Sequence, residues 1–184
     1  MSFKRWLPTF LGFPLGGLLA IQTVGSIHSP LSAAVAGALA GAVIGGAQWL
    51  ALRSSGVRAL WIAATSAALA VGSTLTNVVT DAGTDGGDLA VGGLIAGAAI
   101  GSAQGLVLGR GPRIATAWTA VVAVSWCLGW LTTWAIGVDV ERGYAVFGSS
   151  GAVVVTILTG LALRRLLDSS DHTPAAAPVV EAGT

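Results

Sequence analysis

Residues 37–53 read GALAGAVIGGAQWLALR, and this stretch decides the fold because its pattern returns twice along the chain. Gly37, Gly41 and Gly45 stand four residues apart, so they line one side of a helix. Small residues at this spacing let two helix backbones approach closely in lipid. The spacing therefore predicts a glycine zipper, with Gln48 on the same side of the helix.

The pattern recurs at residues 93–109 and, in a weaker form, at residues 148–164. The small residues of the two later copies are Gly93, Gly97, Gly101 and Gly105, then Gly148, Ala152, Thr156 and Gly160. Gln104 takes the place of Gln48 in the second copy, and Thr159 takes it in the third. Three copies in step predict a protein built by internal repetition.

A second periodicity lies in the segments that alternate with these copies. Each has a Trp followed eleven residues later by a Gly, and the three pairs are Trp6 with Gly17, Trp61 with Gly72, and Trp118 with Gly129. Since this register is independent of the zipper, it supports the same division of the chain.

The composition is that of a membrane protein. Of the 184 residues, 54% are hydrophobic and 9% are charged, whereas roughly a quarter of the residues in a soluble domain carry charge. Six apolar stretches are long enough to cross the hydrocarbon core, for which about 20 residues are needed. They cover residues 6–26, 30–52, 59–80, 89–109, 114–136 and 143–165. We therefore expect an all-α integral membrane protein with six transmembrane helices.

The two periodicities pair these spans into three tandem repeats, over residues 6–53, 59–110 and 114–165. Because each repeat holds two helices, successive copies enter the membrane in the same direction and are parallel repeats. We expect a pseudo-threefold bundle that forms one membrane domain over residues 1–167. Residues 168–184 are small, polar and proline-containing, which predicts a disordered cytoplasmic tail.

The charged residues predict the orientation. Eight of the nine basic residues lie in segments on one side of the predicted membrane, while the acidic turn 81–88 lies on the other. By the positive-inside rule, both termini are cytoplasmic and the protein lies in the inner or plasma membrane. Tryptophans near the cytoplasmic span ends are interpreted as an interfacial aromatic belt, made of Trp6, Trp49, Trp61 and Trp118.

The shared register brings polar residues of different repeats to matching depths. Gln48, Gln104 and Thr159 are expected to form one layer toward the cytoplasm. A second layer, toward the outside, is expected from Gln22, Asn77 and Trp134, each five residues after a glycine of the second periodicity. Amides in a membrane commonly bridge helices, so the layers are interpreted as structural, with a solute-binding site as the alternative.

Trp126, Trp130 and Trp134 recur every four residues and form an indole stripe on one flank of the fifth span. Such a stripe can hold a flat apolar ligand such as a polyene or a quinone. It more often packs against small residues or faces lipid. Both interpretations stay open.

The predicted spans carry no catalytic or metal-binding constellation. No Asp, Glu, Lys, Arg or His lies in the middle of a span, although proton relays and catalytic acids and bases require such groups. The turn with Asp81, Asp85 and Asp88 lacks the alternating acids and the terminal Glu of an EF-hand, so a solvated acidic loop is expected. The sequence predicts no metal, no cofactor and no nucleic-acid partner.

The string G-x-x-x-G-x-x-Q-W-x-x-L-R at residues 41–53 resembles one found in a group of uncharacterised small multi-pass bacterial membrane proteins, which carry it in tandem hairpins. Residues 97–110 match less well, since Gly105 replaces the Trp and Gly109 is inserted before the Arg. The resemblance implies a multi-pass helical fold and brings no known activity.

Two functions fit these patterns. The first is a packing, accessory or partner-binding component of the membrane, which contacts lipid and associates with another membrane protein or with itself. The second is a binding or transport module for a small neutral or lipid-soluble compound held between the Gln and Asn layers and the Trp stripe. An enzyme is disfavoured, because acid and base chemistry needs titratable groups that the predicted spans lack.

Overall fold

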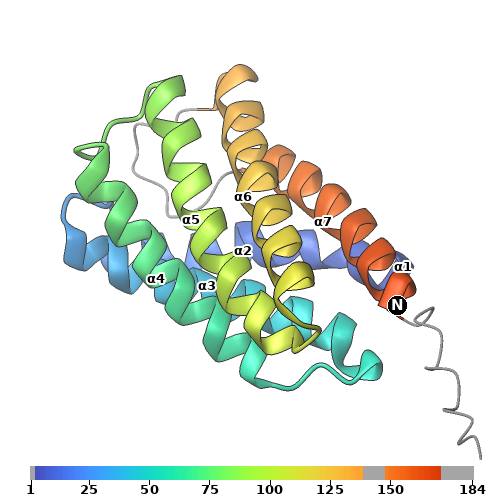
Figure 1. The fold of residues 1–184 in the computed structure, drawn as a ribbon. Coiled ribbons are helices and arrows are strands. Elements are labelled where there is room, and N and C mark those ends of the chain that lie inside the picture. The colour runs from blue at the N-terminus through green and yellow to red at the C-terminus, as the bar shows by residue number, and fades with distance from the viewer. Residues whose placement is uncertain (1–2, 139–147, 171–184) are drawn as a thin grey trace, which may run out of the picture.

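The chain folds into helices throughout the part that the computed structural model describes, which is residues 3–138 and 148–170, with side chains up to Leu166 (Figure 1). Six of the helical segments are long and apolar enough to span a membrane. This confirms the six predicted spans. The protein is therefore a multi-pass membrane protein in contact with the lipid bilayer.

The first span is made of three pieces: α1 (Phe3–Trp6), the 3₁₀ turn η1 (Leu7–Leu11) and α2 (Gly12–Val24). The tighter turn contains Pro8, which has no backbone N–H to donate to an α-helical ladder. The other five spans are α3 (Pro30–Leu52) with η2 (Arg53–Ser55) at its end, α4 (Leu60–Val79), α5 (Gly86–Leu108), α6 (Pro112–Ala135) and α7 (Ser149–Ser170).

Helix ends follow local capping chemistry. The Ser29 side chain accepts a hydrogen bond from the Ser32 N–H at the start of α3, and the Ser32 hydroxyl accepts one from the Ser29 N–H. α5 begins at Gly86 rather than at the predicted residue 89. The reason is Asp85, whose carboxylate accepts hydrogen bonds from the N–H groups of Gly87 and Asp88 at 2.7 and 2.8 Å.

Two predicted segments lie partly beyond the described residues. Residues 143–147, the predicted start of the sixth span, are outside them, and so are residues 171–184 of the predicted tail. α7 continues to Ser170, so the first three residues of the predicted tail are helical.

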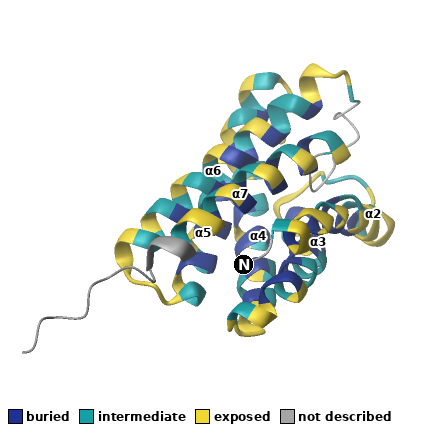
Figure 2. Ribbon diagram, turned by 90° about the vertical axis from the view of Figure 1, so that its right-hand side faces the viewer, coloured by how far each residue is buried: buried dark blue, intermediate teal, exposed yellow. Residues whose placement is uncertain are grey.

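The spans contact one another in chain order, from α2 with α3 through to α6 with α7. The contacts of α3 with α4 and of α5 with α6 are the most extensive. α7 then returns to the first span, where it contacts η1, α1 and α2. Figure 2 shows the consequence for burial, since each helix turns a buried side toward its neighbours and an exposed side outward.

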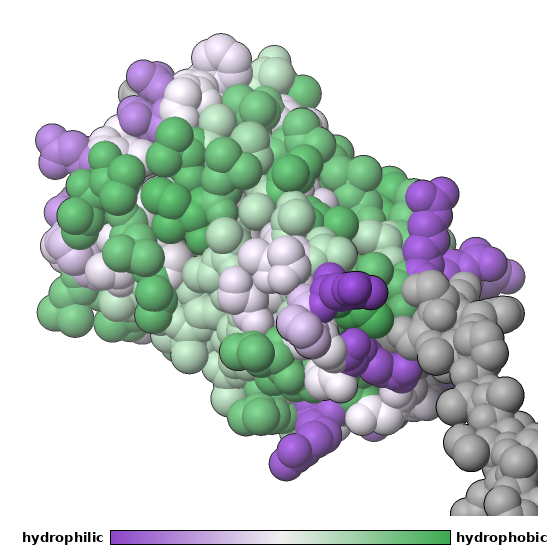
Figure 3. Space-filling model, viewed as in Figure 1, coloured by the Kyte–Doolittle hydropathy of each residue, from purple (hydrophilic) through white to green (hydrophobic). Residues whose placement is uncertain are grey.

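The surface is divided as expected for a protein in a bilayer. In Figure 3, hydrophilic residues gather toward the upper left and lower right of the view, and apolar and small residues cover the surface between them. Many large aliphatic side chains are exposed on the spans, among them Leu15 on α2 and Val71 on α4. Lipid is the natural environment for these side chains.

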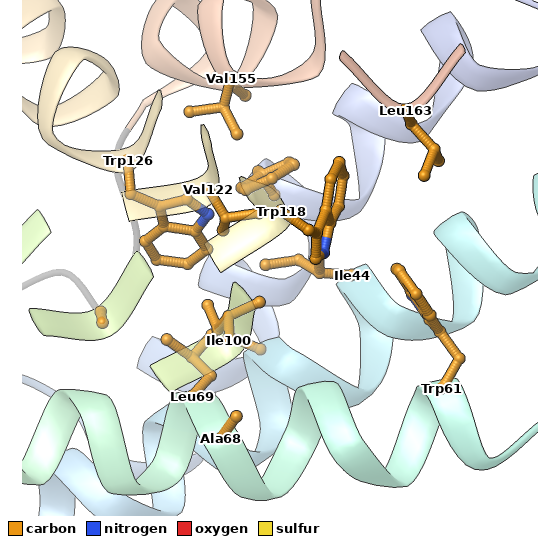
Figure 4. Close-up of a cluster of buried hydrophobic side chains, with 14 of the residues drawn as sticks. Ile44, Trp61, Ala68, Leu69, Ile100, Trp118, Val122, Trp126, Val155 and Leu163 are labelled. Carbon is orange, nitrogen blue, oxygen red and sulfur yellow. The ribbon is translucent and has the colours of Figure 1, made fainter. Parts of the chain in front are cut away.

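The core contains the tryptophans that were predicted to lie at the membrane interface. Trp6 and Trp61 are 0% exposed and Trp118 is 1% exposed, so the interfacial interpretation is wrong for these three residues. They belong to one cluster of buried hydrophobic side chains, part of which is shown in Figure 4. Trp49 is half-buried and donates its indole N–H to the Val57 carbonyl oxygen at 3.2 Å.

Candidate functional site

Two glutamines from different spans meet inside the bundle. Gln48 on α3 is 7% exposed and Gln104 on α5 is 1% exposed. The Nε2 atom of Gln104 donates a hydrogen bond to the Oε1 atom of Gln48 at 3.0 Å. In the order of contacts α4 lies between α3 and α5, so this bond bridges two helices that are not neighbours.

Two buried indoles complete this polar network. Trp61 donates its N–H to the Oε1 atom of Gln48 at 3.1 Å, and Trp118 donates its N–H to the Oε1 atom of Gln104 at 3.2 Å. The two rings are tilted against each other, with their centroids 6.4 Å apart, and Figure 4 shows both within the buried cluster. A buried indole N–H needs such a partner, because an unpaired donor in a low-dielectric interior is costly.

Thr65 on α4 is the fifth member of the network. Its hydroxyl oxygen accepts a hydrogen bond from the Nε2 atom of Gln104 at 2.9 Å and donates one to the Trp61 carbonyl oxygen at 2.8 Å. The network thus joins α3, α4, α5 and α6 through side chains that are all buried. We call these five residues the amide–indole network.

Thr159, expected in the same layer, is buried but bonds within its own helix. Its hydroxyl donates to the Val155 carbonyl oxygen at 2.6 Å. The nearby indole is that of Trp6, which donates to the Thr156 carbonyl oxygen on α7 at 2.9 Å. The structure therefore brings two of the three predicted layer residues together, while in the third copy the Thr156 carbonyl oxygen, rather than the Thr159 side chain, accepts the indole N–H.

The spaced glycines of α3 lie against α4. A Cβ atom built on Gly41 would stand 2.8 Å from the Ser66 Cα atom, and one on Gly45 would stand 2.9 Å from the Thr65 Cβ atom. One built on Gly37 would lie 2.6 Å from the Leu69 carbonyl oxygen. Real Cβ atoms almost never approach other atoms under 3.0 Å. The α3–α4 contact is therefore a backbone-to-backbone contact that needs glycine.

The glycines of α5 lie against α6 in the same manner. Cβ atoms on Gly93, Gly97 and Gly101 would stand 2.7, 2.7 and 2.6 Å from Cα atoms of α6. The third copy differs. Gly148 precedes α7, and a Cβ atom there would make ordinary contacts, the nearest at 3.6 Å, while Ala152 is fully buried.

The close approach of α7 to α6 occurs at Gly151, which the repeat pattern did not single out. A Cβ atom on Gly151 would overlap the Gly129 carbonyl oxygen. Gly151 is out of step with the four-residue spacing of the other copies, so no sequence signal marked it. Gly160, which is in step, lies against Trp6 and Phe3 of the first span.

A cavity of about 100 Å³ opens near the acidic turn, between the α4–α5 turn, α3 and α6. Three candidates from the sequence line it together: Asn77 on α4 with Trp126 and Trp130 on α6. Ser73, Thr76 and Asp88 add polar groups to the wall. The Thr76 hydroxyl is already used, since it donates to the Gly92 carbonyl oxygen at 3.2 Å.

The other two members of the predicted outer layer lie elsewhere. Gln22 is exposed on α2, and Trp134 is 50% exposed with Gly86 next to its ring. The predicted layer of Gln22, Asn77 and Trp134 is therefore not a buried one. The indole stripe is likewise divided, because Trp126 is 3% exposed while Trp134 faces outward.

The acidic turn shows a structural use for one of its carboxylates. Asp85 caps α5, as described above. Across the described ranges, no three His, Cys, Asp or Glu residues are grouped closely enough to hold a metal ion. The single cysteine, Cys127, is half-buried on α6 with a free thiol.

Comparison with models of known protein families, with curated proteins and with solved structures finds no match to this chain. The resemblance of residues 41–53 to tandem-hairpin membrane proteins thus depends on the motif alone.

Proposed function

We propose that the chain is a pseudo-threefold bundle of three two-helix repeats that acts as a packing, accessory or partner-binding component of the membrane rather than as a catalyst. The observation that carries this proposal is the amide–indole network. Gln104 makes three hydrogen bonds, and all of them go to protein groups. Polar groups that hydrogen-bond to one another stabilise a bundle, and few of their donors and acceptors remain to bind a solute.

Three corresponding contacts support the repeats. Trp61 donates to Gln48 and Trp118 donates to Gln104, each on the span that precedes its own. Trp6, on the first span, donates to a carbonyl of α7, the last span. In a threefold ring the last span would precede the first, so the third contact would correspond to the other two in the order of helices, with a backbone carbonyl in place of the amide oxygen.

The zipper glycines support the same arrangement. Gly41 lies against α4, Gly97 lies against α6, and Gly160 lies against Trp6 of the first span. Each copy thus meets the span that follows it around the ring. Because these glycines already contact other helices of the same chain, we expect a partner protein or a second copy to bind the exposed aliphatic surface instead.

The test is to extract the full chain with its surrounding lipid in polymer-bounded nanodiscs and to weigh the particles by native mass spectrometry. The proposal expects a second protein or a second copy in fixed ratio. Particles that contain one copy with a stoichiometric small organic compound would contradict it.

A second candidate function is favoured by the cavity near the acidic turn. Asn77, Trp126 and Trp130 offer one amide and two aromatic walls, a lining that suits a small uncharged compound. If the cavity binds such a compound, Asn77→Leu should remove it from the native mass spectrum while Gln22→Leu, on the exposed side of α2, should keep it. Equal retention in both variants would exclude this cavity as the site.

A further inference from the structure

A basic groove lies at the end of the bundle opposite the acidic turn, between the first span and the end of α3. It is open to the surface and has a volume of about 590 Å³. Lys4 and Arg5 of α1 border it from one side, and Arg53 of η2 borders it from the other. Thr9, Ala47 and Leu50 lie among the residues that line it further into the bundle.

The three cations of the groove have no anionic partner in the described part of the chain. None of the carboxylates whose side chains are described forms an ion pair with them. Asp81, Asp85 and Asp88 stand at the other end of α4, a helix of 20 residues that is about 30 Å long at the usual rise. Arg5 donates its Nη1 hydrogen to the Ser54 hydroxyl oxygen at 3.2 Å, which fixes the guanidinium beside the groove.

The inner part of the groove has an apolar wall, to which Ala47 and Leu50 contribute. Thr9 is 3% exposed, and its hydroxyl oxygen has no hydrogen-bond partner. That oxygen is itself buried, so it is closed off from the groove and offers no hydrogen bond to a ligand there. Leu50, which lines the same groove, is 56% exposed and offers an apolar surface next to the charges.

We propose that this groove binds a phosphate group, which Lys4, Arg5 and Arg53 contact with their charges. Arginine and lysine are the side chains that bind phosphate oxygens, arginine with a planar fork of donors. Basic pockets between membrane helices are known places for anionic headgroups. The phosphate belongs either to the headgroup of an anionic phospholipid, whose chain would lie along Leu50, or to free phosphate in solution.

The experiment uses the full chain in nanodiscs that contain equal amounts of phosphatidylglycerol and phosphatidylcholine, followed by release into a neutral detergent and native mass spectrometry of the retained lipid. We expect the wild type to retain phosphatidylglycerol over phosphatidylcholine by about fivefold or more, given the attraction of clustered basic residues for anionic lipid. The variant Lys4→Gln/Arg5→Gln/Arg53→Gln should retain the two lipids about equally.

The matched control removes three basic residues that do not line the groove, in the variant Arg58→Gln/Arg110→Gln/Arg113→Gln. It loses the same charge, so it should keep the lipid preference if the groove is the site. The single variant Arg53→Gln removes one charge of the groove, and it should reduce the preference by about twofold or more. This variant keeps the proposal testable if the triple variant does not insert.

A second arm distinguishes the source of the phosphate. The melting temperature is measured in sodium phosphate and in sodium chloride of equal ionic strength, for the wild type and both triple variants. One possible result is that phosphate raises the melting temperature of the wild type and of the control variant but not of the groove variant. If that result is found and the wild type shows no lipid preference, the groove binds free phosphate. The proposal is overturned if the wild type shows neither effect, or if both triple variants lose the effect equally.

Discussion

The Nε2 atom of Gln104 on α5 donates a 3.0 Å hydrogen bond to the Oε1 atom of Gln48 on α3, across the inside of the bundle. The two residues hold the same place in their copies of the motif, so one sequence element supplies both donor and acceptor. Each glutamine also receives one indole N–H, from Trp118 and from Trp61. Removal of either amide therefore leaves a buried indole N–H without its acceptor.

The first prediction concerns Gln104→Leu. This change deprives the Trp118 N–H of its acceptor, and it takes one donor each from Gln48 and Thr65. A buried group left unpaired costs about 1–3 kcal/mol, so we expect the free energy of unfolding in detergent to fall by at least that amount. Reversible unfolding by denaturant, followed by circular dichroism, measures it.

The control for this prediction is a double-mutant cycle with Trp118→Phe, which removes the indole donor. If the hydrogen bond matters, the two changes together should cost less than the sum of the single changes, by about 0.5–3 kcal/mol. Simple additivity would show that Gln104 and Trp118 contribute independently. The network would then be a consequence of packing rather than a cause of stability.

The depth of the glutamines could be read from the sequence, but their indole partners could not. Gln48 and Gln104 share a register, and a shared register places residues at one depth. A Trp near the end of a span, however, suits both the membrane interface and the core, since its ring is apolar and its N–H is polar. Only the packing of neighbouring spans decides between these places, and it buries Trp6, Trp61 and Trp118.

The number of spans could likewise be predicted from the sequence, but not all of their ends and contacts. The six apolar stretches were sufficient to predict six spans, because length and composition alone set the requirement. The predicted start of α5 was three residues too late because the apolar stretch begins at Leu89, while the helix begins at the cap that Asp85 provides. Gly151 was missed for a different reason: its neighbour is the Gly129 carbonyl oxygen on another span, a contact that no local pattern encodes.

The second prediction tests the orientation, which the basic residues predict and the fold leaves open. In a Cys127→Ala background, His28→Cys and Ala82→Cys should react with a membrane-impermeant maleimide added to whole cells, because both positions are exposed and lie on the acidic side of the membrane. Ala59→Cys, exposed at the other end of the bundle, should react only after permeabilisation. The opposite labelling pattern would place the basic groove outside the cell.

The third prediction concerns the cap of α5. Asp85→Ala removes the acceptor of the Gly87 and Asp88 N–H groups, and loss of such a cap costs about 0.5–2 kcal/mol. Asp85→Asn keeps an acceptor oxygen and should retain most of the free energy of unfolding. Hydrogen exchange at the first turn of α5 should rise in the Ala variant alone. If exchange rises equally in the Ala and Asn variants, the charge of Asp85, rather than its hydrogen bonds, matters at this position.

The fourth prediction compares two glycines of α3 that lie on different sides of the helix. A Cβ atom on Gly41 would stand 2.8 Å from the Ser66 Cα atom and from the Thr65 carbonyl oxygen, whereas one on Gly46 would meet no atom within 4 Å. The same substitution, Gly to Ala, therefore has opposite steric consequences at the two positions. Because both changes occur in the same helix, helix propensity affects both alike.

At Gly41 the added methyl group meets backbone atoms, which cannot rotate away, so α3 and α4 must separate along their whole contact. We expect Gly41→Ala to lower the free energy of unfolding by about 1–3 kcal/mol, the usual cost of overpacking. Gly46→Ala should leave it unchanged or raise it by up to about 1 kcal/mol, since Ala favours the helix. Melting temperatures in the same detergent give the comparison. If both variants melt alike, α3 and α4 are not held at backbone contact, and the spaced glycines of α3 would have to serve a partner instead.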